Sequence, residues 1–83
     1  MTTVRVTKDI AAENPMAAAF LEVASNEVTS SYPVEFKTIE LYRLTNGLSK
    51  ARLLGTVHGP VRAQNLEVFI NERLKVVRAR TLD

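Results

Sequence analysis

The predicted fold depends on one stretch, residues 59–75, which reads GPVRAQNLEVFINERLK. Gly59-Pro60 is typical of a helix start, because proline is tolerated in the first turn, where its missing N–H is not needed. Apolar residues then follow at the three- and four-residue spacings of one helix face: Ala63, Leu66, Phe69, Ile70 and Leu74. Arg73 and Lys75 would complement the negative carboxyl end of the helix dipole. The stretch therefore predicts a helix.

Two further elements are predicted toward the amino terminus. Residues 3–7 alternate Val4 and Val6 with polar neighbours, which is the two-residue period of a half-buried strand. Asn14 can cap a helix that has Pro15 in its first turn. Helical spacing then continues over residues 15–28 through the following apolar positions: Ala17, Phe20, Leu21, Ala24 and Val28. The sequence predicts a strand followed by a helix.

A hairpin is expected in the middle of the chain, with strands over residues 34–44 and 48–57. Val34 and Phe36 share one parity, whereas Ile39 and Leu41 share the other, so one regular strand face cannot hold all four. A β-bulge near Thr38 would bring them to the same face.

The turn of this hairpin, Thr45-Asn46-Gly47, leaves two registers to compare. A three-residue loop with Gly47 left-handed places Glu40 opposite Arg52, Ile39 opposite Leu53 and Leu41 opposite Ala51. A two-residue loop would instead place Arg43 opposite Lys50. Like charges facing each other across two strands are destabilising, which favours the three-residue loop.

A last strand is expected over residues 76–81, where Val77 and Ala79 alternate with Arg78 and Arg80. The order strand, helix, strand, strand, helix, strand predicts one α+β domain spanning residues 1–83. The simplest arrangement is a two-layer ferredoxin-like βαββαβ sandwich, an antiparallel four-stranded sheet with two helices on one face. In that fold residues 34–44 and 76–81 form the sheet edges, and either edge could pair with a second copy in a homodimer.

Composition excludes several classes of protein. The chain has 83 residues, 46% hydrophobic and 24% charged, which suits a folded domain. It has no cysteine, so disulfides, thiolate metal sites and cysteine nucleophiles are excluded. His58 is the sole histidine and lacks a spaced cluster of carboxylates, so we expect no metal, no cofactor and no enzymatic activity. We detect no internal repeat.

No membrane span or signal peptide is expected. The longest uncharged stretch, residues 53–61, has nine residues, fewer than a spanning helix needs. Charged residues also interrupt the first ten positions, unlike a signal peptide. These observations predict a cytoplasmic protein.

Charge is distributed unevenly. Residues 1–42 carry three basic and six acidic side chains, whereas residues 43–83 carry eight and three. In the predicted sandwich the open sheet face displays a set of basic residues: Arg5, Lys50, Arg52, Arg78 and Arg80. Glu40 and Tyr42 would lie beside them, while Glu22, Glu27, Glu67 and Glu72 would make the helical side acidic. Arginine forks onto carboxylates and phosphates, so the basic residues and Tyr42 form the predicted binding surface.

A second candidate site lies at the expected start of the helix over residues 59–75. Arg62 in its first turn would oppose the helix dipole, and an anion bound beside Gly59 would relieve this. The sequence thus indicates an anion site at Gly59 and Arg62.

Two functions are compatible with these features. The first is a non-enzymatic protein-binding module, such as a small phage-type inhibitor or accessory factor that acts stoichiometrically on a larger protein or nucleoprotein complex, for example a host defence or transcription complex. The alternative is a nonspecific nucleic-acid binder that uses the basic sheet face against phosphates. Base stacking is not expected, because Tyr42 is the only aromatic residue predicted on the open face, and it lies on an edge strand.

Overall fold

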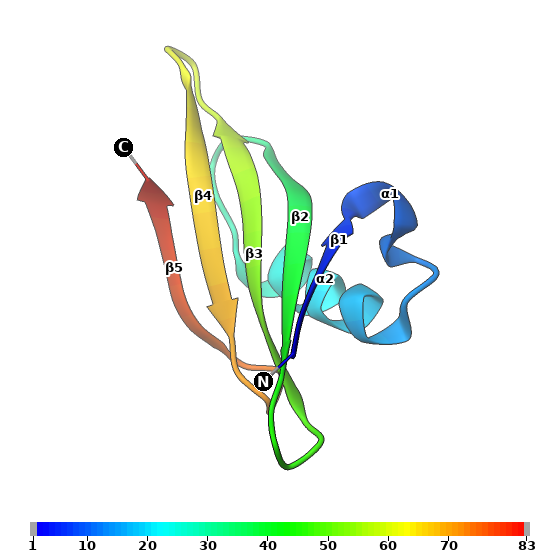
Figure 1. Ribbon diagram of the computed structural model, residues 1–83. Coiled ribbons are helices and arrows are strands. Elements are labelled where there is room, and N and C mark those ends of the chain that lie inside the picture. Colours follow the sequence, from blue (N-terminus) through cyan, green and yellow to red (C-terminus); the bar gives the residue numbers. More distant parts are fainter. Residues whose placement is uncertain (1, 83) are drawn as a thin grey trace.

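The computed structural model describes residues 2–82, except for the side chain of Thr2. Its elements, in chain order, are β1 (Thr2–Thr7), α1 (Lys8–Ala11), α2 (Pro15–Glu27), β2 (Val34–Arg43), β3 (Ser49–His58), β4 (Ala63–Ile70) and β5 (Val76–Leu82). The five strands form one sheet in the order β1-β2-β3-β4-β5, and all neighbours are antiparallel (Figure 1).

The predicted ferredoxin-like βαββαβ sandwich is wrong, because its second helix does not form. Residues 59–62 are a loop, and β4 continues from Ala63 to Ile70 between β3 and β5. Leu66, Val68 and Ile70 lie on one buried face of this strand. Hydrogen bonding on both sides and burial of these side chains favour the strand over the helical spacing read from the sequence.

The sheet edges also differ from the prediction. The strand expected at one edge, now β2, lies between β1 and β3. The two edges are β1 and β5, and β5 matches the other predicted edge strand. A homodimer through residues 34–44 would therefore require an edge that this fold does not have.

The predicted hairpin over β2 and β3 is confirmed in its register and its bulge. Ile39 pairs with Leu53 and Glu40 pairs with Arg52, and the register shifts between Phe36 and Thr38. Opposite the bulge, an added Cβ on Gly55 would clash with the backbone carbonyl oxygen of Glu35. The glycine thus allows the two strands to approach closely at the irregular step.

One face of the sheet is covered by α2, which begins where the sequence predicted. The Asn14 side chain accepts hydrogen bonds from the amides of Met16 and Ala17, so it caps the helix. Its buried residues pack with those of the sheet in a single core whose largest fully buried side chains are Phe20, Ile39, Leu53, Ile70 and Val68. The opposite face of the sheet carries no helix (Figure 1).

Within residues 2–82, neither helix has the length and apolar character needed to cross a membrane.

Candidate functional site

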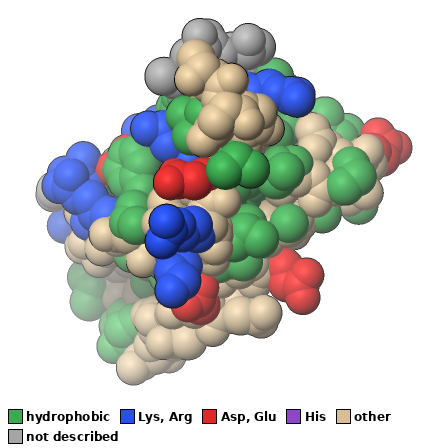
Figure 2. Space-filling view, turned by 90° about the horizontal axis from the view of Figure 1, so that it is seen from below, with side chains coloured by type: hydrophobic (Ala, Val, Ile, Leu, Met, Phe, Trp, Pro, Cys, Tyr) green, Lys and Arg blue, Asp and Glu red, His purple; other side chains and the backbone are tan. Residues whose placement is uncertain are grey.

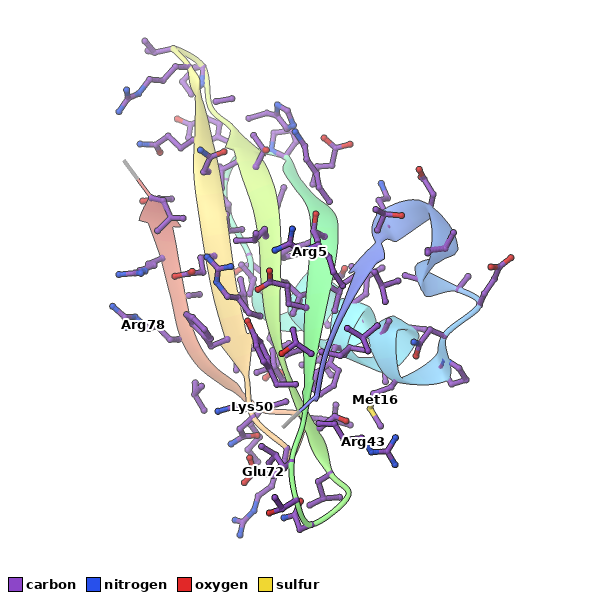
Figure 3. The ribbon with its side chains drawn as sticks, in the orientation of Figure 1. Arg5, Met16, Arg43, Lys50, Glu72 and Arg78 are labelled. Atoms are coloured by element: carbon purple, nitrogen blue, oxygen red, sulfur yellow. The ribbon has the colours of Figure 1, made fainter. Side chains whose placement is uncertain are left out.

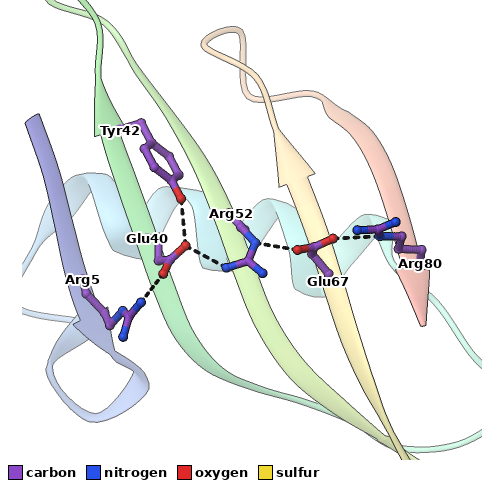
Figure 4. A network of polar contacts seen from close by, with 6 residues as sticks. All are labelled: Arg5, Glu40, Tyr42, Arg52, Glu67 and Arg80. Atoms are coloured by element: carbon purple, nitrogen blue, oxygen red, sulfur yellow. Dashed lines mark hydrogen bonds and ion pairs between the residues drawn. The ribbon is translucent and has the colours of Figure 1, made fainter. Parts of the chain in front are cut away.

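The uncovered sheet face is crossed by a row of ion pairs, in which Glu40 on β2 is the first carboxylate (Figure 4). Glu40 is only 5% exposed. Its carboxylate accepts hydrogen bonds from Arg5 Nη2 at 2.5 Å, Arg52 Nη1 at 3.0 Å and the Tyr42 hydroxyl at 2.8 Å. Three donors from three strands thus surround one buried carboxylate, which offsets the cost of burying its charge.

Glu67 on β4 extends the row toward β5. It is 3% exposed and accepts hydrogen bonds from Arg52 Nε at 2.5 Å and Arg80 Nε at 2.8 Å. Arg52 therefore bridges both buried carboxylates. The whole row, Arg5, Glu40, Arg52, Glu67 and Arg80, spans all five strands and is named here the ion-pair row.

These contacts alter the acidity of the groups involved. The hydrogen bond from Tyr42 lowers the pKa of Glu40 most, burial opposes this, and Arg52 and Arg5 lower it further, to about 2. Burial alone would raise the pKa of Glu67, but hydrogen bonds from Arg52 and Arg80 lower it. The bond to Glu40 also raises the pKa of Tyr42. Both carboxylates are therefore ionised at neutral pH.

The hairpins β2–β3 and β4–β5 resemble each other in sequence and in position, contrary to the absence of an internal repeat noted above. Residues 40–52 read ELYRLTNGLSKAR, and residues 67–80 read EVFINERLKVVRAR. Glu40 and Glu67 each lie four positions before the first turn residue, Leu44 or Asn71. The returning strands then place an arginine opposite each glutamate, Arg52 and Arg80. The second hairpin is one residue longer because of a register shift between Phe69 and Ile70.

A cleft of about 660 Å³ lies where equivalent positions of the two hairpins meet. Tyr42 and Phe69, each two residues after a buried glutamate, contribute aromatic rings to it, and Lys50 and Arg78 contribute positive charge. Ala51, Ile70, Val77, Asn71 and Glu72 complete its lining. The lining combines apolar side chains with two cations and the single carboxylate of Glu72, which leaves a net positive charge and suits a ligand that joins an apolar group to an anionic one.

The five basic residues predicted on the open face divide into two groups. Arg5, Arg52 and Arg80 are committed to the ion-pair row. Lys50 and Arg78 line the cleft instead and make no ion pair within residues 2–82. Figure 3 shows Arg78 projecting from β5 at the sheet edge. Lys50 and Glu72 lie at the end of the sheet that carries the β2–β3 and β4–β5 turns.

The charge distribution also differs from the predicted basic sheet face and acidic helical side. Glu67 lies buried on the open sheet face rather than on a helix, and Glu72 lies in the turn before β5. Seen from the end of the sheet that carries the β2–β3 and β4–β5 turns, positive, negative and hydrophobic side chains are interspersed (Figure 2).

The predicted anion site at Gly59 and Arg62 loses its basis. Both residues lie in the loop between β3 and β4, so no helix begins there to attract an anion. His58 ends β3, and its Nε2 lies 3.3 Å from Glu35 Oε1. Among the described residues, no group of three or more His, Cys, Asp or Glu is arranged to hold a metal ion.

Phe69 is a cleft residue that the sequence did not predict. The helical spacing assigned it to the core, whereas it is partly exposed on the open face, opposite Arg52 and Arg78. Its position relative to Glu67 repeats that of Tyr42 relative to Glu40, and this repetition was the signal that could have found it.

Searches against models of protein families, curated proteins and solved structures found no match to this chain.

Proposed function

We propose that this chain is a non-catalytic, cytoplasmic protein-binding module that acts stoichiometrically on a larger protein and contacts it through the cleft. The observation that carries the proposal is the convergence of Tyr42, Phe69, Lys50 and Arg78 from four strands on one cleft. Aromatic and arginine side chains dominate binding energy at protein interfaces. A partner segment with an apolar side chain next to a carboxylate fits this cleft.

The chemistry of the ion-pair row supports binding over catalysis. A general base or acid works best with a pKa near the working pH. The pKa of Glu40 is about 2, and arginine contacts also lower that of Glu67. Both carboxylates have their oxygens occupied by donors from this chain. The row therefore supports a rigid, positioned Tyr42 beside the cleft better than it supports proton transfer.

Charge reversal of the two cleft cations tests the proposal. A tagged Lys50→Glu, Arg78→Glu double variant should retain less than about a tenth of the partner captured by the unchanged chain from a nuclease-treated lysate of its native cells. Lys37→Glu is the matched control, because Lys37 is exposed at the bulge, away from the cleft. The captured partner is then purified, and binding is measured directly. Equal affinity of the double variant and the control variant would refute the cleft as the binding surface.

A second candidate function is binding to single-stranded nucleic acid. It is favoured by the presence of two aromatic side chains, rather than one, beside two cations on the open face. Only Lys50 and Arg78 lack carboxylate partners among the five basic residues, so few phosphates can be neutralised and the salt dependence should be shallow. Fluorescence anisotropy with labelled single strands at low salt measures this binding, and an unchanged signal removes the candidate.

A further inference from the structure

The free edge of β5 differs from the other edge of the sheet. At the β1 edge, α1 follows directly at one end of the strand and contacts both β1 and β2, whereas nothing in residues 2–82 lies beyond β5 (Figure 1). Residues 77–81 of β5 are all exposed, and Val77 is 61% exposed. An uncovered edge strand presents unpaired backbone donors and acceptors to any extended segment that reaches it.

The charges on β5 select among the segments that could pair with it. The strand contains Arg78 and Arg80 and no acidic residue. Arg80 contacts Glu67 through Nε, and its side chain is 47% exposed, so its terminal nitrogens remain able to donate to a second carboxylate. Arg78 makes no ion pair within the described chain. Acidic side chains on an added strand would therefore meet two arginines.

A second copy of the chain fits this edge poorly. In a symmetric antiparallel pair centred on Ala79, Arg78 of each copy would face Arg80 of the other, and centring on either arginine would place it opposite itself. Like charges directly opposite each other destabilise a pair of strands. The register shift at the Val77 end of β5 interrupts regular pairing there for any added strand. The like charges therefore deter self-association and leave an acidic strand as the better occupant.

Alternation along β5 defines the pattern of the occupant. Arg78 and Arg80 point to the open face, whereas Ala79 pairs with Val68 and points to the helix-covered face, where it is still exposed. An added strand would place acidic residues beside the arginines and apolar residues beside Ala79, since successive side chains point to opposite faces. From this, and resting on the proposed protein-binding function, we infer that the partner contributes a segment of alternating acidic and apolar residues that adds to β5 as a sixth strand.

The test uses the full chain and an acetylated, amidated peptide of alternating Glu and Val. Amide hydrogen exchange should show added protection confined to residues 76–82 when the peptide is bound. A peptide of alternating Lys and Val should bind at least about tenfold more weakly. Arg78→Glu should weaken binding of the Glu peptide by about tenfold, with Lys37→Glu as the control.

A backbone control separates strand addition from binding through side chains alone. The same Glu and Val peptide, with alternate amides N-methylated on the edge that would face β5, keeps every side chain but loses its backbone donors. It should bind about tenfold more weakly than the parent, since more than one hydrogen bond is lost. A peptide methylated on the opposite edge should bind like the parent, apart from the conformational effect of methylation that both peptides share.

The remaining outcomes overturn the inference. Failure of the Glu peptide to bind, absence of protection in residues 76–82, or equal binding of the two methylated peptides would exclude strand addition. If the cleft charge reversals still abolish capture of the native partner, the proposed function stands and only the edge inference falls. If protection of β5 instead rises with the concentration of the chain alone, together with a dimer mass by light scattering, a second copy occupies the edge and the acidic segment is wrong.

Discussion

The hairpins β2–β3 and β4–β5 make the same turn with different residues. In the first, the amide of Leu44 donates to the carbonyl of Leu48 and that of Gly47 donates to the carbonyl of Leu44. In the second, the amides of Asn71 and Leu74 donate in the same pattern. The left-handed position is Gly47 in one turn, with φ 86°, and Leu74 in the other, with φ 60°. One turn uses the residue suited to this conformation, and the other does not.

Side-chain hydrogen bonds account for the second turn. Asn71 Oδ1 accepts hydrogen bonds from the amides of Arg73 and Lys75, whereas Asn46 Oδ1 in the first turn accepts one within residues 2–82, from the amide of Leu48. An asparagine at the first turn position thus holds a backbone path that Leu74 alone disfavours. The comparison teaches that a turn can be specified by a glycine, which is easy to read in a sequence, or by side-chain bonds, which are not.

The largest predicted effect concerns the equivalent arginines of the two hairpins, Arg52 and Arg80, which should contribute unequally to the free energy of unfolding. Arg52 pairs with both Glu40 and Glu67, and its side chain is 27% exposed. Arg80 pairs with one carboxylate within residues 2–82, that of Glu67, and its side chain is 47% exposed. Arg52→Met should lower the free energy of unfolding by about 4 kcal/mol, because two buried carboxylates lose a donor. Arg80→Met should cost about 1 kcal/mol.

Urea unfolding of both variants measures this difference. A loss for Arg80→Met as large as that for Arg52→Met would show that the two hairpins contribute equally and that Arg52 is not the centre of the ion-pair row.

Acid should affect the two hairpins through their buried glutamates. The folded-state pKa of Glu40 is about 2, below the ordinary 4.5, so the unfolded chain binds protons first as pH falls. The stabilisation from Glu40 is full above about pH 5 and is lost toward pH 2, amounting to about 3 kcal/mol. The pKa of Glu67 is also lowered, so its contribution has the same sign.

Unfolding of the unchanged chain and of Glu40→Gln across this pH range isolates the first carboxylate. The variant should be less stable at pH 7 and show a shallower loss in acid, so the two curves converge near pH 2. Parallel curves would contradict the role assigned to Glu40, and Glu67→Gln gives the matching measurement for the second hairpin.

The different turns explain why the sequence predicted one hairpin and missed the other. Asn46-Gly47 marks the first turn. The charges of the side chains that face each other across the two strands then favour the correct register, including Glu40 opposite Arg52. Leu74 carries no such signal. Beside it, β4 places Phe69 on the open face, so Val68, Phe69 and Ile70 form an uninterrupted apolar run. This run interrupts the alternation that marks a half-buried strand and also fits the spacing of a helix face.

The candidate site, like the fold, is predicted from the sequence only where it lies on the correctly predicted strands. The alternation within the correctly predicted strands puts five basic residues and Tyr42 on the open face. Their division into an ion-pair row and a cleft depends on Glu67 and Phe69, which the missed strand brings to that face. The cleft could not be foreseen while these two residues were assigned to a helix.

Exchanging the turn residues gives the smallest predicted effect and the most direct test of the comparison. Gly47→Leu should destabilise the chain by about 1.5 kcal/mol. The first turn would force the new side chain into the left-handed region, and it lacks a pair of hydrogen bonds like those that Asn71 Oδ1 accepts in the second turn. Leu74→Gly should stabilise it by only about 0.5 kcal/mol, since relief of the left-handed leucine is partly offset by the greater freedom of glycine in the unfolded chain. Urea unfolding measures both, with Leu48→Ala, an exposed change in the first turn that leaves φ unaffected, as the control for loss of a side chain. A destabilising Leu74→Gly would mean that the Leu74 side chain, 40% exposed at the turn, contributes more by its packing than its backbone costs, and the two turns would then differ in their contacts rather than in their strain.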